Sequence, residues 1–169
     1  MKVIKNKAIE LTLRNESANI VLGDIKKSKL LETKDAISRI LVYWGLDEMT
    51  RLTRILKFNK NLPSPIERDY KWTGIYTPFD HQRVTSEFLT INTKAFCFNE
   101  AGTGKTSSVL WAADYLMNEN KIKRVLIICP LSIMYSAWQG DIFNTCMHRT
   151  SAVCHGPSHK RKKIIEGEY

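Results

Sequence analysis

The chain has 169 residues, of which 43% are hydrophobic and 25% charged, and its formal net charge is +9. This composition supports a real hydrophobic core in one or two domains, which excludes a disordered or fibrous chain. Because no apolar run approaches the roughly 18 residues that span a membrane, and residues 1–5 lack the apolar stretch of a secretory signal, we expect a cytoplasmic protein.

The first third of the chain predicts a small α+β accessory segment, residues 1–65. Residues 8–13 alternate apolar and polar side chains as a strand does, and residues 20–22 with the Gly-Asp pair that follows predict a second strand and a turn. Residues 46–58 predict an amphipathic helix with a basic face. The sequence Pro63-Ser64-Pro65 forbids helix and marks the boundary with the rest of the chain.

Residues 66–169 alternate between strand and helix patterns. Apolar side chains recur at helical spacing over three segments, and short apolar runs without that spacing predict strands. This alternation predicts an α/β fold in which a parallel sheet is flanked by helices. The expected elements are helices over 80–91 and 106–120, a helix capped by Ser132 with Met134, Trp138 and Ile142 on one face, and strands over 95–98, 125–129 and 152–154.

Between the first of these strands and the next helix lies the sequence Asn-Glu-Ala-Gly-Thr-Gly-Lys-Thr, residues 99–106. Glycines let successive backbone N–H groups converge on an anion, and a following helix adds the positive end of its dipole. A lysine after the second glycine reaches the β- and γ-phosphates of a nucleotide, and the next hydroxyl binds Mg²⁺. The pattern G-x-x-x-x-G-K-[ST] is met except at its first position, where Asn99 replaces glycine.

Three segments in order resemble the opening motifs of the Swi/Snf-like branch of superfamily-two helicases and translocases, of the phage or prophage type. They are Thr77-Pro78-Phe79-Asp80-His81-Gln82, the loop 99–106, and Val125-Leu126-Ile127-Ile128-Cys129-Pro130-Leu131-Ser132 with Trp138 downstream. The resemblance covers about residues 70–156. Its order and spacing are more specific than any one of the motifs.

The resemblance implies that residues 66–169 form part of a RecA-like P-loop domain. It implies that Gln82 contacts the adenine edge of ATP, that the segment after Pro130 contacts the DNA backbone, and that Lys105 and Thr106 act in catalysis, the Thr106 hydroxyl on Mg²⁺. The residues implied to bind the cofactors, ATP and Mg²⁺, are Gln82, Gly102, Thr103, Gly104, Lys105 and Thr106.

Residues after the loop do not supply the rest of a motor. Hydrolysis requires an acidic residue on Mg²⁺ and a group that orients water, and no such acid follows a buried strand before Tyr169. We therefore expect the N-terminal part of an ATP-dependent DNA helicase or translocase, whose acidic motif and second RecA-like domain are missing here. The alternatives are a nucleotide-binding or DNA-binding module without turnover, and another P-loop enzyme.

Positive charge points to DNA as the partner. Residues 1–71 hold 15 basic and 9 acidic residues, against 11 and 8 in the remainder, and residues 160–163 are a basic cluster. Such charge favours contacts with phosphates, independent of base sequence, on duplex or single-stranded DNA. A solvated surface is the alternative interpretation.

A zinc site is the competing chemistry. Cysteine and histidine are ligand types that zinc accepts, but their spacing here includes no Cys-x-x-Cys pair, and the four cysteines of the chain are more typical of buried thiols in a reducing compartment. The candidate ligands are Cys146, His148, Cys154, His155 and His159.

Overall fold

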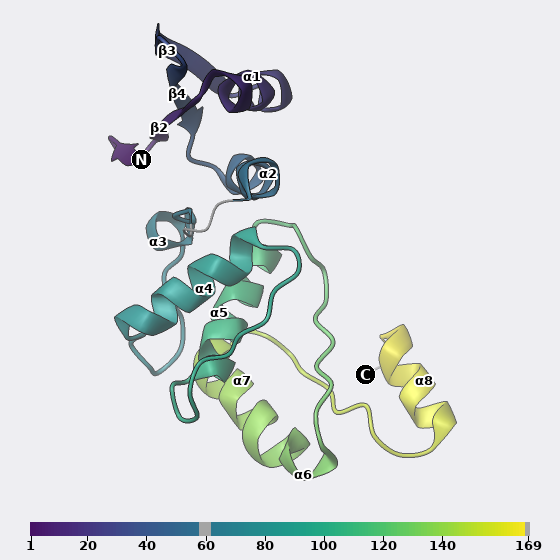
Figure 1. Ribbon diagram of the computed structural model, residues 1–169. Helices are drawn as coiled ribbons and strands as arrows, with labels where there is room; N and C mark the ends of the chain where they lie inside the picture. The colour runs from purple at the N-terminus through teal and green to yellow at the C-terminus, as the bar shows by residue number, and fades with distance from the viewer. Residues whose placement is uncertain (58–61, 168–169) are drawn as a thin grey trace.

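In the computed structural model, which describes residues 1–57 and 62–167, the N-terminal part is an antiparallel sheet (Figure 1). The strands are β1 (Lys2–Ile4), β2 (Ala8–Arg14), β3 (Ser28–Lys34) and β4 (Ile37–Tyr43), in the order β1-β2-β4-β3. The strand predicted over residues 8–13 is confirmed as β2, in which Ile9 and Leu11 are buried as the alternation requires. An α+β arrangement therefore occupies the start of the chain.

The strand predicted over residues 20–22 is wrong, because these residues lie in helix α1 (Asn15–Asp24), which joins β2 to β3. Ala18, Val21 and Ile25 are buried and recur at intervals of three and four residues, the spacing of a helical face. Ile20 points to solvent instead. The helical period over the longer segment overrides the local apolar triplet.

The rest of the described chain is helical and irregular. The helices predicted over residues 80–91 and 106–120 are confirmed within two residues, and the one over 46–58 is confirmed up to Leu56, while Phe58 lies outside the described residues. Among residues 1–57 and 62–167, no helix is long and apolar enough to cross a membrane. The helices after α1 are α2 (Leu46–Leu56), α3 (Ile66–Asp69), α4 (Asp80–Ile91), α5 (Lys105–Asn118), α6 (Leu131–Ile133), α7 (Gly140–Cys146) and α8 (Ser158–Glu166), with a π-helical turn, η1 (Met134–Gln139), between α6 and α7.

The helix predicted to begin at Ser132 is present, with two differences. It starts at Leu131 after Pro130, and η1 interrupts it, so it is α6, η1 and α7 in succession. Trp138 and Ile142 are half-buried and pack against the core, as the predicted apolar face requires. Ser158 is the first residue of α8, and Pro157 holds the cap position.

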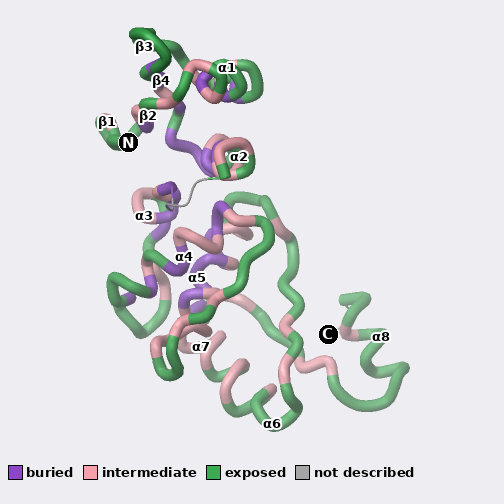
Figure 2. Tube along the Cα trace, in the orientation of Figure 1, coloured by how far each residue is buried: buried purple, intermediate pink, exposed green. Residues whose placement is uncertain are grey.

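The parallel sheet of a RecA-like domain, predicted for residues 66–169, is contradicted. Residues 95–98, 125–129 and 152–154 pair with no other strand among the described residues, and the only sheet there is the antiparallel one in residues 2–43. Phe98 and Ile128 are 88% and 90% exposed, so these segments contribute little to the core (Figure 2). An apolar run favours extended backbone, but a ladder also needs a partner strand about 4.8 Å away, which the run does not specify.

A continuous core connects the sheet to α5. Buried apolar side chains from β2, β4, α1, α2, α4 and α5 form one cluster. The segment 62–66 lies within it: Trp44 Nε1 donates to the Pro63 carbonyl oxygen at 2.9 Å, and the hydroxyl oxygens of Ser64 and Thr90 are 2.6 Å apart. The proline-rich segment therefore packs on both sides, and the domain boundary placed there stays a prediction.

Candidate phosphate-binding site

The loop 99–104 leads directly into α5, beside the start of α4 (Figure 1). Gly102 and Gly104 have φ angles of 76° and 72°, the left-handed region that only glycine enters at little cost. Asn99 is not among the residues with positive φ. The first position of the motif therefore does not need glycine, which explains why Asn99 is accepted there.

The N-terminus of α5 faces this loop. Lys105 is its first residue, Thr106 its second, and its first turn holds no acidic side chain and no side-chain cap among the described residues. The first amide groups of a helix lack intrahelical acceptors and carry the positive end of the dipole. The loop and helix together therefore offer N–H groups that suit an anion.

Lys105 points back onto its own loop. Its Nζ donates to the carbonyl oxygens of Asn99 at 2.9 Å and Glu100 at 2.7 Å. The Thr103 hydroxyl donates to the same Glu100 carbonyl oxygen at 2.8 Å. In this arrangement the lysine holds the loop closed on itself, and a phosphate has to attract the ammonium away from these carbonyls.

The first turn of α4 contacts the loop from the other side. Gln82 Nε2 and His81 Nε2 lie 3.2 Å and 3.0 Å from the Thr103 carbonyl oxygen, so both donate to it, His81 as the Nε2-protonated tautomer. Gln82 Oε1 accepts the backbone N–H of Phe79 at 2.9 Å. Since both ends of the buried Gln82 amide bind protein groups here, its contact with adenine stays a prediction.

A third residue of α4 reaches the start of the loop. Asn99 Nδ2 donates to Thr85 Oγ1 at 2.9 Å, and Thr85 Oγ1 in turn donates to the His81 carbonyl oxygen at 2.7 Å. At the next residue of α4, the buried Ser86 Oγ lies 2.9 Å from the Ser108 carbonyl oxygen of α5. The structure thus brings together, around one loop, every residue that the sequence assigned to the nucleotide.

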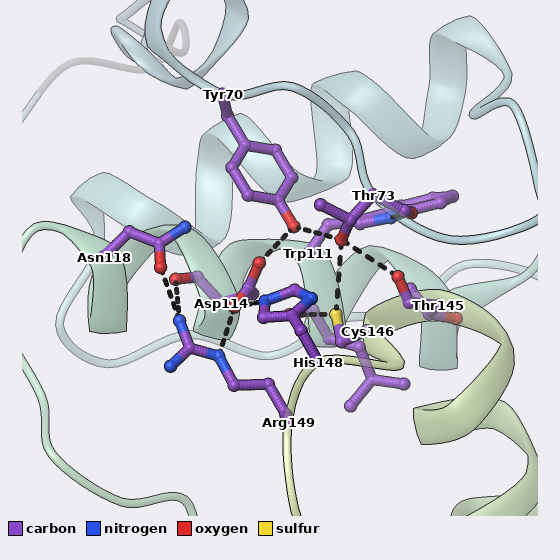
Figure 3. Close-up of polar contacts among 10 residues, drawn as sticks. Tyr70, Thr73, Trp111, Asp114, Asn118, Thr145, Cys146, His148 and Arg149 are labelled. Carbon is purple, nitrogen blue, oxygen red and sulfur yellow. Dashed lines mark hydrogen bonds and ion pairs between the residues drawn. The ribbon is translucent and has the colours of Figure 1, made fainter.

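A second polar cluster, which the sequence did not predict, surrounds Asp114 (Figure 3). The Asp114 side chain is only 1% exposed. Tyr70 donates its hydroxyl to Oδ2 at 2.6 Å, and Arg149 Nε and His148 Nε2 lie 2.5 Å and 2.9 Å from Oδ1. This carboxylate ties the segment after α7 to α5 and to Tyr70, as a buried carboxylate needs several donors to remain charged.

Burial and hydrogen bonding act on Asp114 in opposite directions. Burial raises the pKa of a carboxyl, but hydrogen bonds from Tyr70, Arg149 and His148 outweigh it, so the pKa of Asp114 lies below its ordinary value of 3.8. Burial, together with the bond to Asp114, raises the pKa of the Tyr70 hydroxyl. At neutral pH the cluster is therefore an ionised Asp114 beside a neutral tyrosine. It stabilises the packing of α5 against Tyr70 and against the segment after α7.

The signal that could have found this cluster lies in the helix pattern. Leu110, Trp111 and Tyr115 are buried in α5, and Asp114 occupies the same face at helical spacing. An aspartate on an apolar helix face predicts a buried carboxylate with partners, but the sequence does not say which side chains supply them.

The candidate zinc ligands do not come together. His148 binds Asp114, and the buried Cys146 thiol lies 3.9 Å from the Leu110 carbonyl oxygen. Within residues 1–57 and 62–167, no group of three or more His, Cys, Asp or Glu side chains is arranged to hold a metal ion. The described structure therefore does not support the zinc alternative.

Comparison of the chain with family models, with curated proteins and with solved structures found no match.

Proposed function

We propose that the loop 99–104 and the N-terminus of α5 bind the phosphates of ATP with Mg²⁺. We propose further that the protein takes part in ATP-dependent helicase or translocase activity on DNA. Lys105 is the proposed phosphate ligand and Thr106 the Mg²⁺ ligand. The observation that carries the proposal is the pair of left-handed glycines, Gly102 and Gly104, leading into a helix whose first residue is lysine.

The pose of Lys105 supports this proposal. The Lys105 ammonium is held by two neutral backbone carbonyl oxygens, so no ion pair with a carboxylate is broken when it moves toward a phosphate. A charge-assisted bond to a phosphate oxygen is stronger than a bond to a neutral carbonyl. The lysine is thus held near the loop by contacts that a nucleotide is able to displace.

The proposal that DNA is the partner is supported by charge on α8 and near it. Within residues 158–167 the only ion pair is the exposed one between Lys162 and Glu166, at 3.8 Å. Arg124 Nη1 donates to the Ile165 carbonyl oxygen at 2.8 Å, which adds a further cation at the end of α8. In the N-terminal part, Lys27, Arg39 and Arg51 are paired with carboxylates, whereas other lysines of that part, such as Lys26 and Lys29, are in no ion pair in the described structure. We therefore propose that the DNA phosphates contact α8 in preference to the N-terminal segment.

Isothermal calorimetry with Mg-ATP tests the nucleotide site, using Lys105→Ala and the control Lys94→Ala. Lys94 is an exposed lysine in the segment between α4 and the loop, so both variants remove the same charge. Removal of a charge-assisted bond of about 1.5–3 kcal/mol predicts affinity about 10- to 150-fold weaker for Lys105→Ala and unchanged for Lys94→Ala. Equal binding by Lys105→Ala and wild type contradicts the proposal.

A nucleotide-binding module without turnover is the second candidate. In the described residues no carboxylate accepts a hydrogen bond from Lys105 or from the loop, and Glu100 of the loop is exposed. Phosphoryl transfer needs groups that position the metal and the attacking water. Binding of Mg-ATP without Lys105-dependent phosphate release, with DNA present, distinguishes this module from a motor.

A further inference from the structure

The position at which the loop departs from the general pattern is also the position that binds α4. Asn99 makes two contacts: its carbonyl oxygen accepts Lys105 Nζ at 2.9 Å, and its side-chain Nδ2 donates to Thr85 Oγ1 at 2.9 Å. Thr85 is buried in the middle of α4. A glycine at position 99 has no side chain and makes no such contact.

The other contacts of α4 reach a different point on the loop. His81 and Gln82 hold the Thr103 carbonyl oxygen, near the end of the loop, whereas Thr85 holds its first residue. Between the two anchors lies Gly102, whose backbone is left-handed and which has no atom within 4 Å of an added Cβ. The loop is therefore fixed at both ends and open in the middle.

We propose that Asn99 and Thr85 are a positioning pair for the phosphate-binding loop. The Asn99–Thr85 bond ties the first residue of the loop to α4, and so keeps the loop in the curled arrangement that phosphate recognises. Neither side chain contacts the nucleotide in this role. The inference rests on the proposed nucleotide site and assigns to it two residues outside the glycine-lysine motif.

Ordering a flexible loop has an entropic cost. Because the pair orders the loop before the ligand arrives, this cost does not reduce the affinity for the ligand. Removing the bond leaves the first residue of the loop free to turn, so the loop has to be ordered when the phosphate binds. The expected effect is about fivefold weaker binding, the change in equilibrium that one hydrogen bond of ordinary net strength makes.

Thr85→Val tests the pair, because valine keeps the shape of threonine and removes its hydroxyl. Thr50→Val is the matched control: Thr50 Oγ1 bonds the Leu46 carbonyl oxygen at 2.8 Å, the same bond four residues back that Thr85 makes to His81 at 2.7 Å. Thr50 lies in α2, which does not contribute to the loop. Comparing the two variants separates the effect of the loop bond from that of removing a helix hydroxyl.

Calorimetry with Mg-ATP should give about fivefold weaker binding for Thr85→Val, no such weakening for Thr50→Val, and recovery for Thr85→Ser, which keeps the hydroxyl. Asn99→Ala should weaken binding to a similar extent, and combining it with Thr85→Val should add little, since both remove one bond. Equal affinity of Thr85→Val and Thr50→Val overturns the inference, even if Lys105→Ala abolishes binding and so supports the nucleotide site.

Hydrogen exchange without nucleotide gives a second, independent readout. The amides of residues 99–104 should exchange faster in Thr85→Val than in wild type or Thr50→Val, while the melting temperatures of the two valine variants stay similar. Unchanged exchange in the loop overturns the inference. If wild type does not bind Mg-ATP and Lys105→Ala behaves the same, the proposed function fails, and the exchange result then decides only whether Thr85 orders the loop.

Discussion

Replacing Asp114 with asparagine should destabilise the protein substantially, although the two side chains have nearly the same shape. The carboxylate is 1% exposed and accepts bonds from Tyr70, His148 and Arg149. Asparagine has one acceptor oxygen and no charge, so it cannot accept all three bonds and it loses the ion pair with Arg149. The loss of that pair corresponds to about 1.5–3 kcal/mol in the free energy of unfolding.

The expected destabilisation is measurable by thermal or urea denaturation. At about 2–4 °C per kcal/mol for a chain of this size, the melting temperature should fall by about 3–12 °C. Tryptophan fluorescence follows unfolding, and part of its signal comes from Trp111, which lies in the same helix and whose Nε1 donates to the Thr73 carbonyl oxygen at 2.9 Å (Figure 3). The exposed Asp47, which pairs with Lys121, supplies the control Asp47→Asn, for which little change is expected.

The pH dependence gives a second test with a defined sign. The pKa of Asp114 is lowered in the folded protein, so its contribution to stability is complete above the ordinary value of 3.8 and is lost as the pH falls through the lower, folded pKa. Wild type and Asp114→Asn should therefore differ most near neutral pH and converge below about pH 3.8. Equal free energies of unfolding of wild type and Asp114→Asn at pH 7, or a difference that grows on acidification, contradict the assignment of Asp114 as an ionised residue that stabilises the fold.

Two further predictions concern the loop and α8. Gly104→Ala should weaken Mg-ATP binding more than Gly102→Ala. An alanine in the left-handed region costs about 1–2 kcal/mol at either position, but only a Cβ at Gly104 overlaps the Gln82 amide. Equal affinities of the two variants in calorimetry contradict this contact. Replacing Lys160, Arg161 and Lys163 with glutamine should reduce the salt dependence of DNA binding, measured by fluorescence anisotropy, by about 0.9 in log–log slope for each DNA phosphate that is no longer neutralised. Replacing Lys26, Lys29 and Lys34 is the matched control, and a larger effect there places the DNA on the N-terminal sheet instead.

Several elements could be predicted from the sequence because their causes are local. The helices α4 and α5 follow from apolar side chains at intervals of three and four residues, and β2 from strict alternation. Gly102 and Gly104 predict a backbone that other residues avoid, and both have the positive φ that this requires. The predicted phosphate-binding loop is thus a loop in the structure, entering a helix at Lys105 as expected.

The failed predictions concern which segments meet. Residues 95–98 and 125–129 have strand-like composition, but pairing depends on a second strand, and in the described structure it is the N-terminal strands that pair, in antiparallel register. Residues 20–22 are apolar enough for a strand, but α1 buries Ala18 and Val21 on one helical face. Short apolar runs are ambiguous because periodicity over three residues cannot separate a strand from a helix.

For this protein, the sequence by itself determined the local chemistry: a glycine-lysine loop, the helix behind it, and an excess of positive charge. Only the tertiary structure decided that α4 holds both ends of that loop, through Thr85 at Asn99 and through His81 and Gln82 at Thr103. It also decided that Asp114 meets Arg149, which lies 35 residues away along the chain. The reason is physical: helix period and backbone conformation depend on neighbours in sequence, whereas hydrogen-bond partners in a core depend on how separate elements pack.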